Sequence, residues 1–277
     1  GGKKMKKLLC AVLSGIMAFS TFAVAVPITA SAAESQESVS ATYGDFEYTL
    51  ADDYTCTITK YNGHATNVTI PSTIYGNKVC KIGNDSFCDN NNIISVTIPN
   101  TVKEIGGSAF ADCYSLSTVT FSNSLKSIGG GAFEKTNLKK VTIPNSVTEI
   151  DDYAFSGCEN LSSLTLSNKL ESIGYATFRY CKSLTSITLP NSLKYLDWYL
   201  FSGCTSLKTV SIGSSLQECY NQGSYGFIFE DCTALESITV SSSNNNYSSA
   251  NGIMYDKKKT EILVYPQAKK DTTYTLS

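Results

Sequence analysis

LTSITLPNSLKYLDWYLFSGCTS, residues 184–206, follows LSSLTLSNKLESIGYATFRYCKS, residues 161–183, and matches it in register. A phenylalanine marks the same point of every such unit, and the spacings between successive ones are 23, 23, 22, 23, 23 and 28 residues. These residues are Phe87, Phe110, Phe133, Phe155, Phe178, Phe201 and Phe229. A fixed period of this length is typical of a solenoid, in which each unit contacts only its neighbours.

Each unit opens with alternating apolar and polar residues, as in Leu184-Thr-Ser-Ile187-Thr-Leu189. This alternation predicts a short strand with one buried face. A turn such as Pro190-Asn191-Ser192 follows, and then a second apolar pair. At the next position, where we expect a sharp bend or a positive φ, glycine alternates with aspartate. The residues are Gly83, Gly106, Gly129, Asp151, Gly174 and Asp197.

One turn cannot bury its apolar residues alone, whereas stacked turns pair their strands and stack their phenylalanines into a continuous spine. The unit Leu-x-x-Leu-x-Leu-Pro-Asn-Ser-Leu-x-x-Ile-Gly-x-x-Ala-Phe-x-x-Cys resembles the BspA-like leucine-rich repeats of bacterial surface proteins, over residues 68–241. The resemblance implies a leucine-rich-repeat solenoid wound as a right-handed coil, with one parallel strand and a short helical or irregular turn per repeat.

Both ends of the array differ from the repeats. Residues 43–67 are expected to form an N-terminal β cap, in which a hairpin of residues 46–50 and 56–61 covers the edge of the first turn. Residues 242–277 resemble the hairpin insertion that interrupts many such arrays, followed at residues 274–277 by the start of a further repeat. We therefore expect the chain to be a fragment or to lack a natural C-terminal cap.

Residues 1–32 have the composition of a leader and signal peptide. Four lysines precede the apolar segment Leu8–Val26, and Ala30-Ser31-Ala32 supplies the small residues that a signal peptidase requires. The alternative is a membrane anchor, which the polar Ser14 and Thr21 and the adjacent cleavage pattern disfavour. We predict a secreted or cell-surface protein with no membrane insertion after signal removal, in which residues 33–42 are a linker.

The charge balance limits the partners. The chain has 22 Lys and Arg and 24 Asp and Glu, so removal of four leader lysines leaves 18 basic and 24 acidic residues, a formal charge near −6. Nucleic acid is not an expected partner, because phosphate binding needs clustered Lys and Arg. The family resemblance instead implies an extracellular protein or polysaccharide.

Five cysteines lie three residues after a repeat phenylalanine. They are Cys113, Cys158, Cys181, Cys204 and Cys232, and Thr136 occupies this position in another unit. Side chains in one line along a solenoid do not converge on a metal ion, so we predict no metal site. The main interpretation is a buried column of thiols that pack as small apolar groups. A disulfide between neighbouring units, within the set Cys158, Cys181 and Cys204, is the alternative.

Residue patterns that support catalysis are lacking. His64 is the sole histidine and follows Asn62-Gly63 in an expected turn, away from the serines and cysteines of the repeats. Paired acids such as Asp151-Asp152 fall in turns, where solvation explains them. The Gly129-Gly130-Gly131 run lacks the lysine and the helix of a phosphate-binding loop. We predict neither enzymatic activity nor a cofactor.

The solvent-facing strand position carries a hydroxyl group in every unit. The residues are Thr97, Thr120, Thr142, Thr165, Thr188, Ser211 and Thr239. The simplest interpretation is that threonine suits an exposed strand position. The functional alternative is a hydroxyl ladder that binds an extended ligand, such as a glycan or a partner's backbone, and ice is a more remote alternative. The candidate ligand-binding residues of this ladder are Thr120, Thr142, Thr165 and Thr188.

Four aromatic residues replace polar or small ones within one stretch. Tyr175 and Trp198 stand where other units have Gly107, Gly130 or Asp152, so we expect them to be exposed neighbours on successive turns. Tyr180 and Tyr195 are the other two replacements. Exposed aromatic patches often mark binding sites, so all four are candidate ligand-binding residues. The alternative is repeat drift, with the rings packed on one another.

A loop accompanies this patch, because the 28-residue spacing before Phe229 inserts about five residues at 221–225. Our main functional hypothesis is an extracellular recognition module that mediates adhesion through a rigid solenoid surface. The rival hypothesis is a structural spacer that presents another domain, missing from this sequence, away from the cell.

Overall fold

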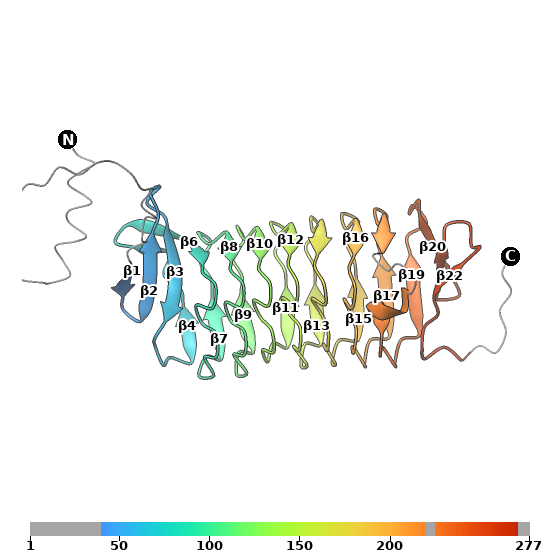
Figure 1. The fold of residues 1–277 in the computed structure, drawn as a ribbon, viewed down its shortest axis with the longest axis horizontal. Coiled ribbons are helices and arrows are strands. Elements are labelled where there is room, and N and C mark those ends of the chain that lie inside the picture. The colour runs from blue at the N-terminus through green and yellow to red at the C-terminus, as the bar shows by residue number, and fades with distance from the viewer. Residues whose placement is uncertain (1–39, 220–224, 271–277) are drawn as a thin grey trace, which may run out of the picture. The chain divides into compact units, whose positions relative to one another are not determined.

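The strands of the computed structural model stack side by side, turn after turn (Figure 1). The structure describes residues 40–219 and 225–270, all within the unit Ser38–Ser277. The predicted leader (1–32), most of the linker (33–42), most of the inserted loop (221–225) and the strand start at 274–277 lie outside the described residues. The one helix among the described elements is η1 (Tyr225–Phe229), a 3-10 helix. No helix in this part of the chain has the length and apolar composition to cross a membrane.

A first row of parallel strands follows from the alternating segments. It consists of β4 (Asn67–Thr69), β7 (Ser95–Thr97), β9 (Thr118–Thr120), β11 (Lys140–Thr142), β13 (Ser163–Thr165), β15 (Ser186–Thr188), β17 (Thr209–Ile212) and β19 (Ser237–Val240). Its ladder divides into the sheets β4-β7-β9, β11-β13 and β15-β17-β19. The parallel stacking confirms the predicted solenoid of stacked turns.

A second row comes from the second apolar pair of each turn. It consists of β6 (Asn77–Ile82), β8 (Glu104–Ile105), β10 (Ser127–Ile128), β12 (Glu149–Ile150), β14 (Ser172–Ile173), β16 (Tyr195–Leu196) and β18 (Glu218–Cys219). The parallel ladder runs unbroken from β6 to β14, and β16 pairs with β18. Each turn is therefore held to the next by two ladders, and the prediction of one parallel strand per repeat was wrong because the second apolar pair also forms a strand.

The N-terminal strands join the second row. β1 (Ser40–Tyr43) and β2 (Phe46–Leu50) are antiparallel, as are β2 and β3 (Cys56–Tyr61). β3 then pairs in parallel with β6, and the short β5 (Thr73–Ile74) pairs antiparallel with β6. The assignment of residues 40–42 to a linker was wrong, because these residues form a ladder with β2 and satisfy its otherwise open edge.

The C-terminal part is a three-stranded antiparallel sheet of β20 (Tyr247–Ala250), β21 (Ile253–Asp256) and β22 (Ile262–Val264). Asn251 and Gly252 connect β20 and β21 with φ values of 51° and 77°, the left-handed pair that a tight hairpin turn requires. The Tyr247 hydroxyl accepts a hydrogen bond from the Cys219 amide at 3.1 Å. This hydrogen bond joins β20 of the C-terminal sheet to β18 of the second row.

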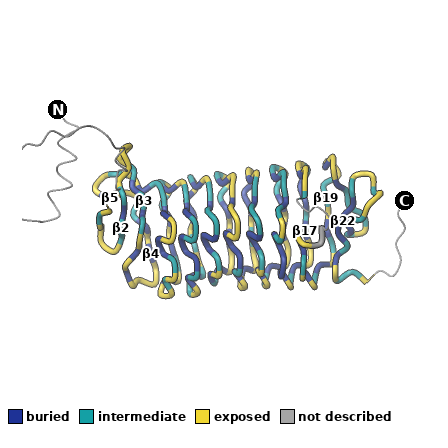
Figure 2. Tube along the Cα trace, in the orientation of Figure 1, coloured by how far each residue is buried: buried dark blue, intermediate teal, exposed yellow. Residues whose placement is uncertain are grey.

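The core is a stack of phenylalanine rings that runs through all seven repeats. Successive ring centroids are 4.7 to 5.8 Å apart, and every one of these rings is buried. Tyr61 continues the stack, with its centroid 5.2 Å from that of Phe87. Buried residues recur at the same place in each turn (Figure 2), so the predicted spine is confirmed.

The glycines of the repeat have a different role from the one expected. Gly106, Gly129 and Gly174 do not adopt positive φ, so that part of the prediction was wrong. A Cβ on Gly129 would lie 2.7 Å from the Gly107 nitrogen in the preceding turn, so close backbone approach excludes a side chain. Left-handed residues instead come two positions later, with φ between 50° and 62°. They are Asp85, Ser108, Gly131, Tyr153, Ala176 and Tyr199.

Candidate functional site

The predicted hydroxyl ladder lies on the exposed side of the first row. Thr120, Thr142, Thr165 and Thr188 are all exposed. Where adjacent strands pair, the hydroxyl residues face each other in register, as Thr142 faces Thr165 and Thr188 faces Ser211. We call this side of the first row the hydroxyl face.

A second column on the hydroxyl face was missed by the sequence analysis. It runs two residues before the first column, and its members are Ser95, Thr118, Lys140, Ser163, Ser186, Thr209 and Ser237. The alternation that predicts the strands also places these residues outward. Lys140 interrupts the column, so the hydroxyl groups do not form one continuous array.

The aromatic replacements lie elsewhere, beyond the second row. Tyr153 and Tyr199 occupy the left-handed position described above, with φ values of 56° and 57°. Tyr180 occupies a second left-handed position, with a φ of 58°, where other turns have Gly157 or Gly203. A bulky side chain is disfavoured in this conformation by about 1–2 kcal/mol. The solenoid backbone imposes the conformation, but it does not require tyrosine there.

Four aromatic rings from successive turns contact one another in a row. The centroid of Tyr175 lies 5.2 Å from that of Tyr153 and 5.6 Å from that of Tyr199. The row ends at Phe227 of η1, 5.5 Å from Tyr199. Neighbouring ring planes are inclined at 62°, 65° and 36°. Tyr175 is half-buried in this row, and burial, followed by the hydrogen bond with Tyr153, raises the pKa of its hydroxyl.

Arg179 connects this row to Tyr180. Its guanidinium carbon lies 4.6 Å from the Tyr180 ring centroid and 5.6 Å from that of Tyr199. Its Nη2 donates a hydrogen bond to the Tyr180 hydroxyl at 2.9 Å. We call these six residues the aromatic cluster: Tyr153, Tyr175, Arg179, Tyr180, Tyr199 and Phe227.

The structure therefore brings together two of the four predicted aromatic residues, Tyr175 and Tyr180. Trp198 is 43% exposed, and its carbonyl accepts the Ala176 amide, the same bond that the Tyr175 carbonyl makes with Tyr153 one turn earlier. Trp198 and Tyr175 thus hold equivalent positions on successive turns. Tyr195 is half-buried in β16, opposite Glu218 of β18, and does not belong to the cluster.

The cysteine column lies inside the solenoid. Each of its five thiols is within 3.0 to 3.4 Å of the carbonyl oxygen of the repeat phenylalanine one turn earlier, to which it donates. Burial raises the pKa of Cys113, Cys158 and Cys232 to about 12. Cys158, Cys181 and Cys204 are free thiols, so the alternative of a disulfide between neighbouring units is not what the structure contains. A protonated, buried thiol is a structural donor and a poor nucleophile.

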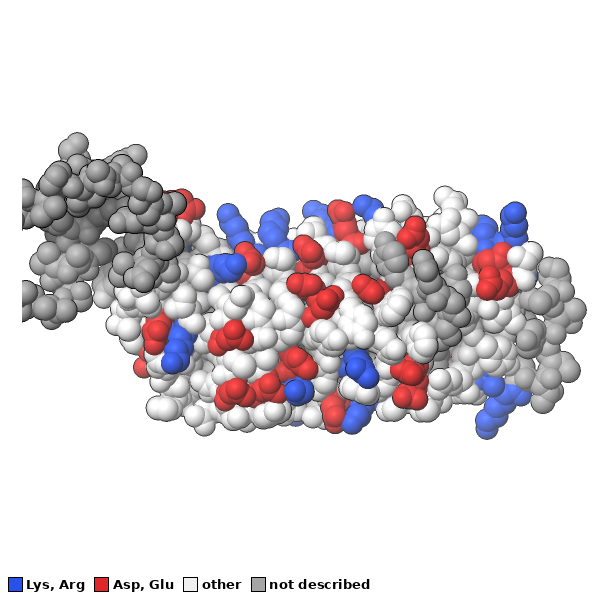
Figure 3. Space-filling model, in the orientation of Figure 1, with Lys and Arg blue, Asp and Glu red and all other residues white. Residues whose placement is uncertain are grey.

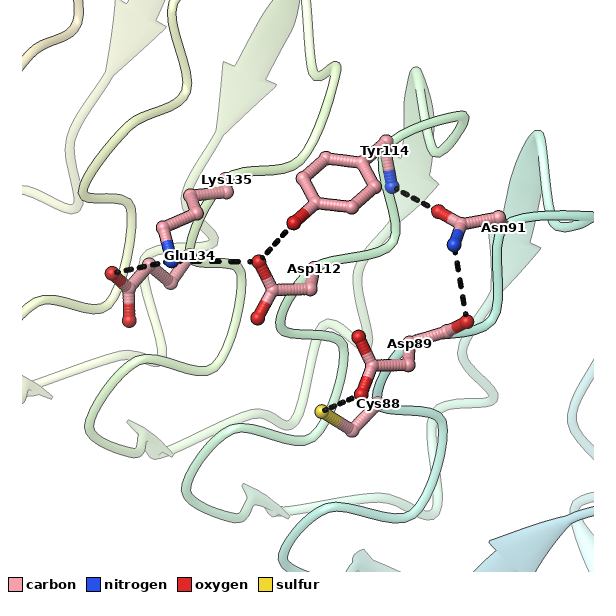
Figure 4. Close-up of polar contacts among 7 residues, drawn as sticks. All are labelled: Cys88, Asp89, Asn91, Asp112, Tyr114, Glu134 and Lys135. Atoms are coloured by element: carbon pink, nitrogen blue, oxygen red, sulfur yellow. Dashed lines mark hydrogen bonds and ion pairs between the residues drawn. The ribbon is translucent and has the colours of Figure 1, made fainter.

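A polar network crosses three turns nearer the N-terminus (Figure 4). The Asn91 side chain accepts the Tyr114 amide at 3.1 Å, and the Tyr114 hydroxyl donates to Asp112 at 2.7 Å, which raises the pKa of that hydroxyl. Lys135 lies 3.5 Å from the same Asp112 oxygen. Within the described ranges, no cluster of three His, Cys, Asp or Glu side chains is placed to hold a metal ion. The role that these contacts indicate for the network is to join three successive turns of the solenoid.

A shallow hollow of about 390 Å³ lies over the second row. Acidic and small residues line it, among them Glu104, Glu149, Asp151 and Gly129. Lys81 pairs with Glu104 at 2.5 Å. On the face drawn in Figure 3, acidic side chains are frequent across the middle, and the basic side chains along the upper edge have acidic ones among them.

Sequence comparison finds the family described as BspA type Leucine rich repeat region, which matches residues 80–181 and 148–264 with 6 copies. No curated protein matches the chain.

Three solved structures are similar. A leucine rich cell surface protein from Faecalibacterium prausnitzii A2-165 is 32% identical with a TM-score of 0.72, over 86% of this chain and 64% of that one. The T. pallidum Leucine Rich Repeat protein is 30% identical with a TM-score of 0.60, over 65% and 83%. Pneumococcal vaccine antigen PcpA, 23% identical with a TM-score of 0.55 over 87% and 59%, shares the fold. This chain thus spans less than two thirds of the first and third of these proteins.

Proposed function

Because the chain belongs to the family of BspA-type leucine-rich repeats, we propose that it is a bacterial recognition module, secreted or held at the cell surface, which binds an extracellular protein or polysaccharide without transforming it. One observation carries this proposal: aromatic rings lie together and partly exposed where other turns of the same solenoid have small or polar residues. The stacking of turns does not require aromatic side chains at these positions, whereas binding sites are rich in them.

Export is part of the proposal. The lysine-rich start and apolar segment within residues 1–32 support a signal peptide, and the similar Faecalibacterium prausnitzii protein, a cell surface protein, supports the location. The mature chain would then meet its ligand outside the cell.

The proposed organisation keeps the predicted division, with the cap extended to Ser40. Residues 40–67 would close the array at its first turn, because Tyr61 stacks on Phe87 and covers the end of the spine. Residues 68–241 would form the recognition surface, and the sheet β20–β22 would adjoin its last turn.

The proposed site consists of the aromatic cluster and Trp198, and we name this set the aromatic surface. The hydroxyl face is the second candidate contact, through Thr120, Thr142, Thr165 and Thr188. It ranks lower because exposed threonine also suits a strand for purely structural reasons.

The test is binding of the purified chain to an array of polysaccharides and extracellular-matrix proteins, beside a Tyr175→Ala/Trp198→Ala double variant. Tyr114→Ala is the matched control, because Tyr114 is a 56% exposed tyrosine outside the aromatic surface. We expect the wild type and Tyr114→Ala to bind a common ligand that the folded double variant loses. If neither the wild type nor the variants bind any ligand, the chain is better explained as a spacer.

A further inference from the structure

Arg179 is the only arginine of the sequence, and Trp198 is its only tryptophan. They lie 19 residues apart, within the stretch that forms the aromatic surface. Tryptophan, tyrosine and arginine are the residues most enriched at the energetic centres of protein interfaces. Arginine also differs from the lysines used in the rest of the chain, because its planar fork binds a carboxylate with two hydrogen bonds and stacks on aromatic rings.

The contacts of Arg179 fix its side chain but leave its charge uncompensated. The guanidinium lies over Tyr180 and Tyr199, and one nitrogen donates to the Tyr180 hydroxyl. Its Nε is buried and has no hydrogen-bond partner. Every ion pair in the described part of the chain is made by a lysine, so Arg179 has no carboxylate partner there.

Two carboxylates in the turns that carry Tyr175 and Trp198 or precede them already accept hydrogen bonds from backbone amides. An Asp152 oxygen accepts the Tyr175 amide at 2.7 Å, and an Asp197 oxygen accepts the Trp198 amide at 2.7 Å. Both carboxylates stabilise the turns in which they lie. Arg179 is therefore the one cation of the aromatic cluster, and it can receive a carboxylate from outside.

The shape of the surface favours a protein over a sugar polymer. A sugar ring that stacks on an aromatic side chain needs an open ring face, but Arg179 lies over the faces of Tyr180 and Tyr199. Tyr180 also packs on Gly203, where a Cβ would lie only 2.2 Å from its Cδ1 atom. Tyr175 meets Tyr153 at 62° and Tyr199 at 65°, so this part of the surface offers ring edges, hydroxyls and a guanidinium group.

We infer that the aromatic surface binds a protein segment that places an acidic side chain on Arg179 and apolar side chains beside Trp198 and Phe227. This inference rests on the recognition function proposed above and names its partner class. The rings and Arg179 are held before binding, so little conformational entropy is lost when the partner docks.

The experiment selects a phage-displayed library of random peptides against the full chain. Binding of the enriched peptides, made synthetically, is then measured with the wild type, Arg179→Gln and Arg179→Lys. Lys182→Ala is the matched control, because it removes a cation from the same turn whose ammonium pairs with Glu159 at 2.7 Å. Thermal unfolding of each variant establishes that it is folded.

We expect the enriched peptides to share an Asp or Glu beside apolar residues. Changing that acid to its amide should weaken wild-type binding by about 30-fold and should have little further effect in Arg179→Gln, because the two changes remove the same contact. Arg179→Lys should recover only part of the affinity, and Lys182→Ala should bind as the wild type does.

Three results would overturn the inference. The first is that enriched peptides lack an acid or that no peptide is enriched, and the second is that the amide change has equal effects in the wild type and Arg179→Gln. The third is Arg179-dependent binding of hyaluronan, an acidic polysaccharide, without peptide binding. A failure of the recognition function looks different, because then no peptide, matrix protein or polysaccharide binds the wild type at all.

Discussion

Phe155 and Tyr153 lie two residues apart in one turn, but their rings have opposite surroundings. Phe155 is buried between Phe133 and Phe178 in a stack with a ring in every repeat. Tyr153 is 38% exposed and contacts Tyr175 in a row confined to a few turns. Because the interior ring has a neighbour on both sides, each turn must supply one. No such requirement applies to the outer ring. Surface positions can therefore differ from turn to turn, and this variation allows a solenoid to carry a specific surface.

The largest effect should come from the interior. Phe155→Ala should lower the free energy of unfolding by about 3–5 kcal/mol, because it leaves a cavity inside the stack. Tyr153→Ala should lower it by no more than about 1.5 kcal/mol, the range of one aromatic pair. Urea unfolding followed by circular dichroism compares the two. Equal losses would contradict the distinction between the interior stack and the outer row.

The next effect concerns backbone contact between turns. Gly129→Ala should destabilise the chain by about 1–3 kcal/mol, because the new Cβ would meet the backbone of the preceding turn at 2.7 Å. Gly107→Ala is the control, since its nearest contact, at 3.4 Å, is ordinary, and its stability should change by about 0.5 kcal/mol or less. Thermal unfolding measures both. If both alanines are tolerated, close approach does not explain the glycine register.

The thiol column predicts a pH dependence. Burial raises the pKa of Cys158 from 9.0 to about 12, so the thiol ionises more readily in the unfolded chain. Its contribution to stability is fully present below pH 9 and is lost as the pH rises from 9 towards 12, at up to about 1.4 kcal/mol per pH unit.

Cys158→Thr tests this contribution, because Thr136 shows that the repeat accepts threonine there. Melting temperatures between pH 8 and 11 should fall less steeply for the variant than for the wild type. Parallel curves would mean that Cys158 does not contribute.

The smallest effect on stability should come from Trp198→Ala, at about 0.5 kcal/mol or less, since its ring is 43% exposed. The same change should weaken ligand binding by about 30-fold if Trp198 is part of the site. Calorimetry of unfolding and of binding gives the two values. A large loss of stability with unchanged binding would mean that Trp198 supports the fold and does not contact the ligand.

The periodic parts of the molecule could be predicted from sequence, because every turn must supply the same interior residues for the turns to stack. The phenylalanine period predicts the spine, and alternation predicts the strands, including residues 46–50 and 56–61. The glycine register was misread because a close backbone approach and a left-handed φ select the same residue. The structure is needed to tell close backbone approach from a left-handed φ.

Only two of the six residues of the aromatic cluster, Tyr175 and Tyr180, were predicted from sequence, and the reason is geometric. Tyr153, Tyr175 and Tyr199 are not at one repeat position, because the row alternates between two adjacent positions from turn to turn. A comparison of equivalent positions therefore found Tyr175 and Trp198 but missed Tyr199 and Tyr153. Arg179 was missed because its significance lies in its stacking and not in its spacing, although its being the sole arginine was a usable signal.

One measurement tests most directly whether the aromatic surface serves recognition: ligand affinity of a variant that returns three surface residues to those of other turns. Trp198→Gly, Tyr199→Ser and Tyr180→Gly copy Gly107, Ser108 and Gly157, and glycine relieves the left-handed backbone at residue 180. We predict a folded solenoid that melts near the wild-type temperature and binds the ligand at least about 30-fold more weakly. Wild-type affinity in the folded variant would contradict this role for the surface.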